Sequence, residues 1–186
     1  MDFKATFIEH LPEWIVVIIV LLLLGYVAHV IRKEKKYYLE TAIPIKFKNF
    51  KLLIPSWWSI KTREENLIEY HRTDTYYDWR AKFLWIPFTH PSSKQTLEDI
   101  FASLIIERGI QFDVKEAIIN EQDYSIRVEG TATQNLEHRI YFDALLVEDK
   151  HQNGYLYCES RSSILNGMLE GPYFEDVINR LQKNLV

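Results

Sequence analysis

The sequence predicts an α+β protein in which one N-terminal transmembrane helix precedes an antiparallel β-sheet domain with two packed helices. An apolar run at residues 14–31 contains no Asp, Glu, Lys or Arg. Most of the later chain alternates apolar and polar residues in short runs separated by turn residues, a pattern typical of antiparallel strands. Two other segments, within residues 97–109 and 171–185, repeat apolar residues at helical spacing.

The apolar run organises the chain. Eighteen residues in a helix span about 27 Å, close to the hydrocarbon thickness of a bilayer. A cleavable signal peptide has a basic start and small residues before its cleavage site. Here residues 1–13 carry three acidic residues and one Lys, and the run ends directly at the basic cluster 32–36. The pattern predicts a membrane helix at 14–31 after a short extracytoplasmic segment, 1–13.

Basic residues predict the orientation of this helix. Four of them follow the run within five positions, and only Lys4 precedes it. Because Lys and Arg flanking a span stay on the cytoplasmic side, we expect the N-terminus outside, the C-terminal domain in the cytoplasm, and a bacterial inner membrane as the location. The residues expected at the membrane surface are Arg32, Lys33, Lys35 and Lys36.

Charge is unevenly distributed along the chain. Residues 32–51 carry seven basic and two acidic residues, a net charge of +5, whereas residues 52–186 carry fourteen basic and twenty-one acidic residues, a net charge of −7. The positive segment suits anionic lipid, although it is equally typical of the topology determinant of any single-span protein. The acidic remainder argues against nucleic acid as a partner.

After a basic juxtamembrane linker at 32–44, residues 45–186 are long enough for one domain with one core. Asn49 and the Asn153-Gly154 dipeptide predict turns. Thr96, with Asp99 three residues later, predicts the start of a helix, and Gly109 its end. Gly171-Pro172 is expected to begin the last helix. The expected strands are 45–48, 50–54, 58–62, 66–72, 77–88, 111–119, 124–129, 138–147 and 155–160.

Three motifs of this domain resemble the Mog1/PsbP-like group of small α/β domains. An early strand runs into Ile54-Pro55-Ser56-Trp57, a middle helix contains Thr96-Leu97-Glu98-Asp99-Ile100, and a closing helix contains Gly171-Pro172-Tyr173-Phe174-Glu175-Asp176-Val177. The sequence departs from the group in its long third strand and in the loop at 88–93. The resemblance implies a binding or assembly accessory without cofactor or catalytic residues.

The residues themselves contain no catalytic constellation. Glu69, His71 and Asp74 are the nearest approach to metal-ligand spacing, but on a charged strand they are more typical of a solvated face. The single cysteine, Cys158, lies in an apolar stretch and is expected to be buried. Two serines, Ser162 and Ser163, lack the Gly-x-Ser-x-Gly setting of a nucleophile. We therefore expect no metal, no cofactor and no enzymatic activity.

Surplus aromatic residues and the span supply the candidate partner contacts. In a strand, adjacent tryptophans point to opposite faces, so one of the two is expected to lie under a helix, at lipid or against a partner. In the span, two small residues and one polar residue favour a helix–helix contact. The candidates are Trp57, Trp58, Tyr76 and Tyr77 in the domain, and Gly25, Ala28 and His29 in the span.

The leading hypothesis is a non-enzymatic, single-pass membrane accessory subunit. Its span docks in a larger membrane protein complex, and its cytoplasmic domain binds a protein partner. Two alternatives stay open. One is a membrane-proximal enzyme with a pocket built from His71, His90 or His138 and nearby carboxylates such as Asp143. The other is a domain that encloses a lipid or a small ligand.

Overall fold

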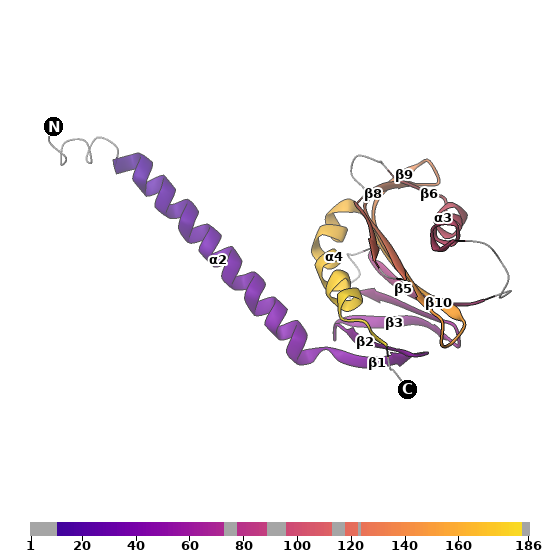
Figure 1. Ribbon diagram of the computed structural model, residues 1–186. Coiled ribbons are helices and arrows are strands. Elements are labelled where there is room, and N and C mark those ends of the chain that lie inside the picture. Colours follow the sequence, from indigo (N-terminus) through magenta and orange to yellow (C-terminus); the bar gives the residue numbers. More distant parts are fainter. Residues whose placement is uncertain (1–10, 73–77, 89–95, 113–117, 123, 184–186) are drawn as a thin grey trace. The chain divides into compact units, whose positions relative to one another are not determined.

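The computed structural model describes residues 11–72, 78–88, 96–112, 118–122 and 124–183 (Figure 1). The chain divides into two compact units, residues 1–42 and residues 43–186.

The described residues of the first unit form the helix α2 (Leu11–Thr41). Its segment Glu13–Thr41 is long and apolar enough to cross a membrane, and none of its most apolar stretch is buried. The helix continues through the basic cluster to Thr41, where the sequence predicted a linker. No Gly or Pro interrupts residues 32–41, and Lys36 and Glu40 form an ion pair of 3.7 Å one turn apart.

The described residues of the second unit form two antiparallel sheets and two helices, which confirms the predicted fold class. The smaller sheet has the order β1-β2-β11, and the larger has the order β3-β4-β5-β10-β9-β8-β6 with β7 paired to β8. The strands are β1 (Ile43–Phe47), β2 (Phe50–Ile54), β3 (Trp58–Glu64), β4 (Leu67–Arg72), β5 (Arg80–Pro87), β6 (Ile110–Phe112), β7 (Ile118–Gln122), β8 (Ser125–Gln134), β9 (His138–Asp149), β10 (Gly154–Ser162) and β11 (Gln182–Lys183).

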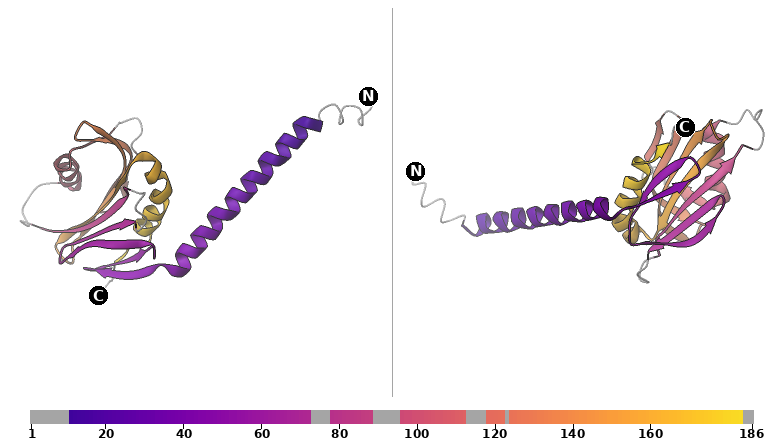
Figure 2. Two further views of the ribbon diagram at one scale, coloured as in Figure 1. Left: turned by 180° about the vertical axis from the view of Figure 1, so that it is seen from behind. Right: turned by 90° about the horizontal axis from the view of Figure 1, so that it is seen from below.

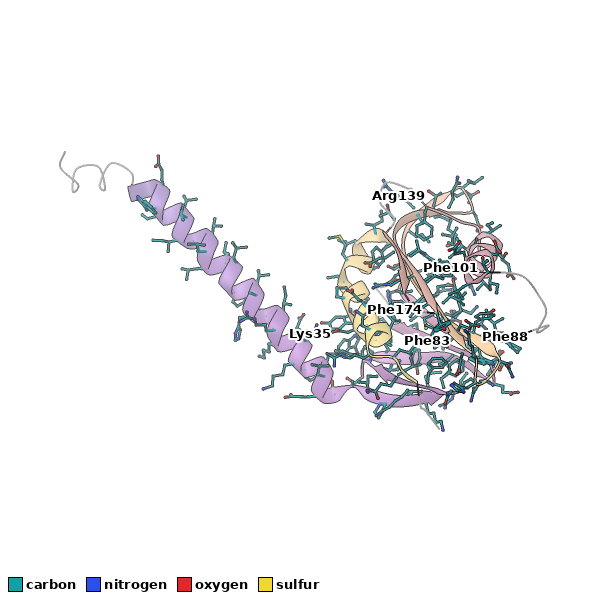
Figure 3. The ribbon with its side chains drawn as sticks, in the orientation of Figure 1. Lys35, Phe83, Phe88, Phe101, Arg139 and Phe174 are labelled. Carbon is teal, nitrogen blue, oxygen red and sulfur yellow. The ribbon has the colours of Figure 1, made fainter. Side chains whose placement is uncertain are left out.

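Helices α3 (Leu97–Glu107) and α4 (Ile164–Asn179) lie on opposite faces of the larger sheet (Figures 1 and 2). Each covers a separate apolar cluster, because strand side chains alternate between the two faces. Under α3, Phe101 packs near Tyr157 with ring centroids 6.4 Å apart. Under α4, Phe174 packs near Phe83 at 6.2 Å (Figure 3). The α4 cluster also includes residues of β1 and β2.

Local signals in the sequence located several boundaries correctly. Asn49 lies in the turn between β1 and β2, where Lys48 has a φ of 52°. The Thr96 hydroxyl accepts from the Asp99 backbone N–H, and the Asp99 carboxylate accepts from the Thr96 N–H, so the capping box is present. Gly109, with a φ of 64°, follows the end of α3 in the left-handed conformation that glycine favours.

The start of α4 and the number of strands differ from the prediction. The helix begins at Ile164, seven residues before Gly171, and Pro172 lies inside it. Pro lacks the N–H of a helix interior and its ring crowds the carbonyl four residues earlier, so the packing of the helix against the sheet has to offset both costs. The short strand β11 was not expected, and the predicted strand at 111–119 corresponds to β6 and part of β7.

Two glycines let α4 approach the sheet closely. A Cβ at Gly167 would lie 2.4 Å from Cβ and Cγ of Tyr141, and a Cβ at Gly171 would lie 3.1 Å from Cε1 of the same residue. Ordinary carbon contacts are about 3.5–4.0 Å. Helix α4 therefore packs directly against Tyr141 through Gly167 and Gly171.

Gly167→Ala is expected to lower the free energy of unfolding by up to about 2 kcal/mol. Overpacking against Tyr141 costs about 1–3 kcal/mol, of which the better helix propensity of Ala recovers about 1 kcal/mol. Urea unfolding of the full chain in a neutral detergent, followed by tryptophan fluorescence, measures the change. Gly171→Ala is the matched control, with a smaller loss expected, and equal stability of the two variants would contradict the packing argument.

Candidate partner-binding surface

Helix α4 presents an apolar stripe away from the sheet. Leu165, Met168 and Leu169 are 71%, 68% and 48% exposed, and Pro172 is also exposed. These residues follow the spacing i, i+3, i+4, i+7, so they line one face of the helix. The opposite face is buried and consists of Gly167, Glu170, Gly171, Phe174, Val177 and Ile178. We call Leu165, Met168, Leu169 and Pro172 the α4 outer face.

The N-terminus of α4 is fixed by a residue distant in sequence. Ser163 precedes the helix and makes no side-chain cap of its own. Instead Asp78 accepts hydrogen bonds from the Ser163 N–H at 2.8 Å, the Ser163 hydroxyl at 3.2 Å and Asn166 Nδ2 at 2.8 Å. Burial acts to raise the pKa of Asp78, but these hydrogen bonds outweigh it and lower the pKa below its usual value. The carboxylate thus stays ionised where the helix dipole favours it.

A buried carboxylate joins α4 to strands β3 and β4. Glu170 is 1% exposed and forms an ion pair with Arg72. Its Oε2 accepts from Nε1 of Trp58 at 2.9 Å and from Nε1 of Trp57 at 3.4 Å. Three donors therefore satisfy a charge that would otherwise be costly to bury.

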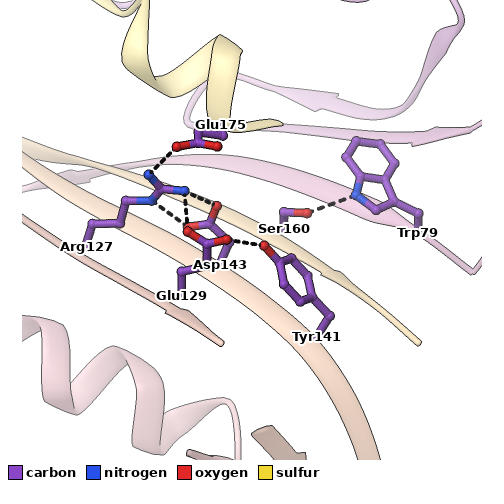
Figure 4. Close-up of polar contacts among 7 residues, drawn as sticks. All are labelled: Trp79, Arg127, Glu129, Tyr141, Asp143, Ser160 and Glu175. Atoms are coloured by element: carbon purple, nitrogen blue, oxygen red, sulfur yellow. Dashed lines mark hydrogen bonds and ion pairs between the residues drawn. The ribbon is translucent and has the colours of Figure 1, made fainter. Parts of the chain in front are cut away.

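A second charged cluster joins α4 to strands β8 and β9 (Figure 4). Arg127 donates to both oxygens of Asp143 at 3.0 and 2.8 Å. It also donates to Glu129 at 2.9 Å and to Glu175 of α4 at 3.4 Å. Glu129 in turn accepts from the Tyr141 hydroxyl. One guanidinium therefore contacts three carboxylates.

Burial disfavours the charged forms of both Asp143 and Arg127, but it sets the direction of the pKa shift only for Asp143. Burial raises the pKa of Asp143 to about 6, although the Arg127 guanidinium acts to lower it. Burial also disfavours the charged form of Arg127, but the hydrogen bonds and charge of Asp143 outweigh it and hold the Arg127 pKa above its usual range. The pair is fixed in geometry, and Asp143 is 0% exposed, so the cluster is a support for the helix.

The structure alters the expectation for the two tryptophans. Trp57 lies in the turn before β3 and not in a strand, so both indoles reach the same carboxylate, Glu170. Trp58 is 5% exposed and stacks near Trp79, with ring centroids 4.3 Å apart. Trp57 is half-buried and meets Tyr173 of α4 edge-on at 4.9 Å. Trp57 thus flanks the α4 outer face, whereas Trp58 belongs to the core.

The other predicted contact residues have simple placements. Tyr76 and Tyr77 lie outside the described residues. Gly25, Ala28 and His29 are exposed on α2, at a spacing that places them on one helix face. The four basic residues predicted at the membrane surface, Arg32, Lys33, Lys35 and Lys36, are exposed on the same helix.

The catalytic candidates do not come together in the described part of the chain. His138 is exposed near Glu137, whereas Asp143 pairs with Arg127 on the opposite face of β9. No group of three potential metal ligands occurs among the described residues. Glu69 pairs instead with Lys61 at 3.7 Å, and the other candidates, Asp74 and His90, lie outside the described ranges.

The cysteine is buried, and the two serines make hydrogen bonds within the fold. Cys158 is fully buried, as expected, and burial raises the pKa of its thiol. The Ser162 hydroxyl donates to the Ser163 carbonyl, and the Ser163 hydroxyl donates to Asp78. Neither serine is paired with a histidine in these contacts.

Sequence reasoning missed the α4 outer face. The spacing of Leu165, Met168, Leu169 and Pro172 is visible in the sequence. The prediction began the helix at Gly171, however, so three of these residues were assigned to a connection and not to a helix face. Asp78, which fixes the true start, lies 85 residues earlier in the chain than Ser163.

No family model and no curated protein sequence matches the chain. Solved structures do match its fold. The Ran-binding protein Mog1p of Saccharomyces cerevisiae aligns with a TM-score of 0.52 and 5% identity, over 77% of this chain and 95% of Mog1p.

The solution structure of cyanobacterial PsbP (CyanoP) from Synechocystis aligns with a TM-score of 0.52 and 8% identity, over 77% of this chain and 93% of CyanoP. At such low identity these likenesses bear on the fold alone. The resemblance found in the sequence is thereby confirmed at the level of the fold: the domain that begins at Ile43 has the Mog1/PsbP-like fold.

Proposed function

We propose that this protein is a non-enzymatic, single-pass membrane accessory subunit whose domain binds a protein partner through the α4 outer face. The carrying observation is the exposure of three large apolar side chains, Leu165, Met168 and Leu169, on a helix that is otherwise firmly held. An amphipathic surface helix normally turns polar residues to water. Burying such side chains in a partner is favourable at roughly 25 cal/mol per Å² of apolar surface.

The supports beneath α4 favour a preorganised surface. Asp78, Glu170 and the Arg127 cluster fix the helix at its start, its middle and its later turns. A helix held in this way loses little conformational entropy on binding. The half-buried Trp57 and Tyr173 lie beside the stripe and extend the apolar contact area.

The proposal for the first unit rests on α2. We propose that α2 spans the membrane with the N-terminus outside and the domain in the cytoplasm of a bacterium, and that the face of Gly25, Ala28 and His29 contacts other membrane subunits. The length and composition of the helix support the span alone. We propose that Arg32, Lys33, Lys35 and Lys36 contact lipid headgroups.

Orientation is tested by cysteine labelling in intact cells. Because the native Cys158 is fully buried, a single added cysteine at the exposed Ser103 of α3 reports the position of the domain. A membrane-impermeant maleimide is expected to label Ser103→Cys only after the cells are opened. Labelling of intact cells would overturn the proposed orientation.

Partner binding is tested by charge insertion on α4. The double variant Leu165→Glu/Met168→Glu, extracted from native membranes in mild detergent, is expected to run as a smaller species than the wild type. Its thermal midpoint should stay within a few degrees, because both side chains are exposed. Ala102→Glu, on the exposed face of α3, is the matched control. A wild-type protein that extracts only as a monomer would contradict the proposal.

A further inference from the structure

Two arginines and a histidine form a row across the larger sheet on the α3 side. Arg80 of β5 lies directly opposite Arg161 of β10, and His71 of β4 lies opposite Arg80 on its other flank. Paired residues on neighbouring strands project from the same face. Like charges directly opposite one another are destabilising, so this arrangement requires a counter-charge.

The described carboxylates do not supply that charge fully. Arg161 approaches Glu159 only to 4.0 Å. Glu159 is already paired with Arg108 at 2.8 Å and accepts from the Tyr157 hydroxyl at 3.0 Å. Within the described ranges Arg80 forms no ion pair of 4.0 Å or less. The positive charges of Arg80 and Arg161 are therefore only partly compensated by carboxylates, although the domain as a whole is acidic.

These two arginines line a solvent-open pocket of about 320 Å³. The volume lies at the lower end of the range for small-molecule sites. Hydroxyl and amide groups complete the polar lining, and Ile140 supplies an apolar wall. Asp78 also lines the pocket and stays ionised through its hydrogen bonds with Ser163 and Asn166, so its single negative charge offsets only one of the two arginines. The lining residues are Asp78, Arg80, Gln134, Asn135, Ile140, Arg161 and Ser162.

We propose that this pocket binds a small phosphate-bearing molecule, with the phosphate group between Arg80 and Arg161. Guanidinium groups present a planar fork that matches phosphate oxygens, and a phosphate dianion neutralises two facing cations. The amides of Gln134 and Asn135 are placed to contact the rest of the molecule. The site goes beyond the proposed partner binding and shares no residue with the α4 outer face.

The test is calorimetric titration of the full chain in neutral detergent with inorganic phosphate at low ionic strength. Wild-type protein is expected to bind phosphate, and Arg80→Gln and Arg161→Gln are expected to bind at least ten-fold more weakly. Arg161→Lys keeps the charge without the fork and should lose less. Arg63→Gln removes an exposed charge away from the pocket and should bind as the wild type does. Absence of binding by the wild type, or equal binding by all variants, would overturn the proposal.

Thermal unfolding gives a second, independent measurement. Phosphate is expected to raise the melting temperature of the wild type, because a ligand that binds only the folded state stabilises it. Without phosphate, Arg161→Gln is expected to be at least as stable as the wild type, since one of two facing like charges is gone. A variant less stable than the wild type in phosphate-free buffer would show that the two arginines already have a counter-charge.

Discussion

Glu170→Ala is expected to cost about 3–5 kcal/mol of domain stability, because it removes the carboxylate of a buried ion pair. Arg72 would lose its carboxylate, and the indole N–H groups of Trp58 and Trp57 would lose their acceptor. For a domain of this size the melting temperature should fall by about 10 °C. Thermal unfolding of the full chain in neutral detergent, followed by near-UV circular dichroism, measures the change.

Two variants sharpen this result. Glu170→Gln keeps the length of the side chain and one acceptor oxygen, so it should cost less than Glu170→Ala. Glu107→Ala removes an exposed carboxylate from α3 and should change stability by less than about 0.5 kcal/mol. If Glu170→Ala were no worse than Glu107→Ala, the cluster around Glu170 would not hold α4 to the sheet.

Arg127→Met is expected to cause a loss of similar size that depends on pH. The substitution removes the cation from among three carboxylates and leaves Asp143 buried beside Glu129. An unpaired buried charge costs about 3–5 kcal/mol. Adding Asp143→Asn to Arg127→Met removes the uncompensated charge, so the double variant should recover part of the lost stability. Failure of the second substitution to restore any stability would contradict this assignment.

The pH dependence follows from the raised pKa of Asp143. Its pKa is about 6 in the folded domain and about 3.9 in the unfolded chain, so the folded state binds more protons between these values. This contribution is fully present below about pH 4 and is lost as the pH rises through about 6. In Arg127→Met the Asp143 pKa should rise further, so this contribution to stability should be lost at a higher pH than in the wild type. Urea unfolding at pH 5 and pH 8 measures both effects, and the Asp143→Asn variant should not show them.

Local chemistry explains the boundaries that the sequence predicted well. The Thr96–Asp99 capping box and Gly109 define α3, since the residues that satisfy its ends lie within one turn of them. The α4 boundary could not be found in the same way. The carboxylate that accepts from the N–H of the N-cap residue Ser163 belongs to Asp78, 85 residues earlier in the chain. A cap supplied by a distant residue leaves no local pattern.

The prediction of the candidate surface was limited for the same reason, because residues far apart in the chain determine it. The sequence indicated that Trp57 and Trp58 could not both enter one core, because strand residues alternate in direction. Because Trp57 lies in a turn, that constraint does not apply to it, and the indole N–H groups of both tryptophans donate to the buried Glu170. From the sequence alone, a glutamate on a helix is expected to be exposed to solvent. Only the tertiary structure shows the partners that bury it.

The sequence by itself determined the apolar N-terminal helix, the α+β class of the domain and the likeness to the Mog1/PsbP-like fold. The helix and the fold class follow from the period and length of hydrophobic runs, which involve near neighbours in the chain, and the likeness rests on three local motifs. Only the tertiary structure decided which face of α4 is exposed, which carboxylates are buried, and that Arg80 and Arg161 stand side by side. Such facts depend on pairs of residues far apart in the chain, because burial and charge compensation are properties of the assembled sheet and helices.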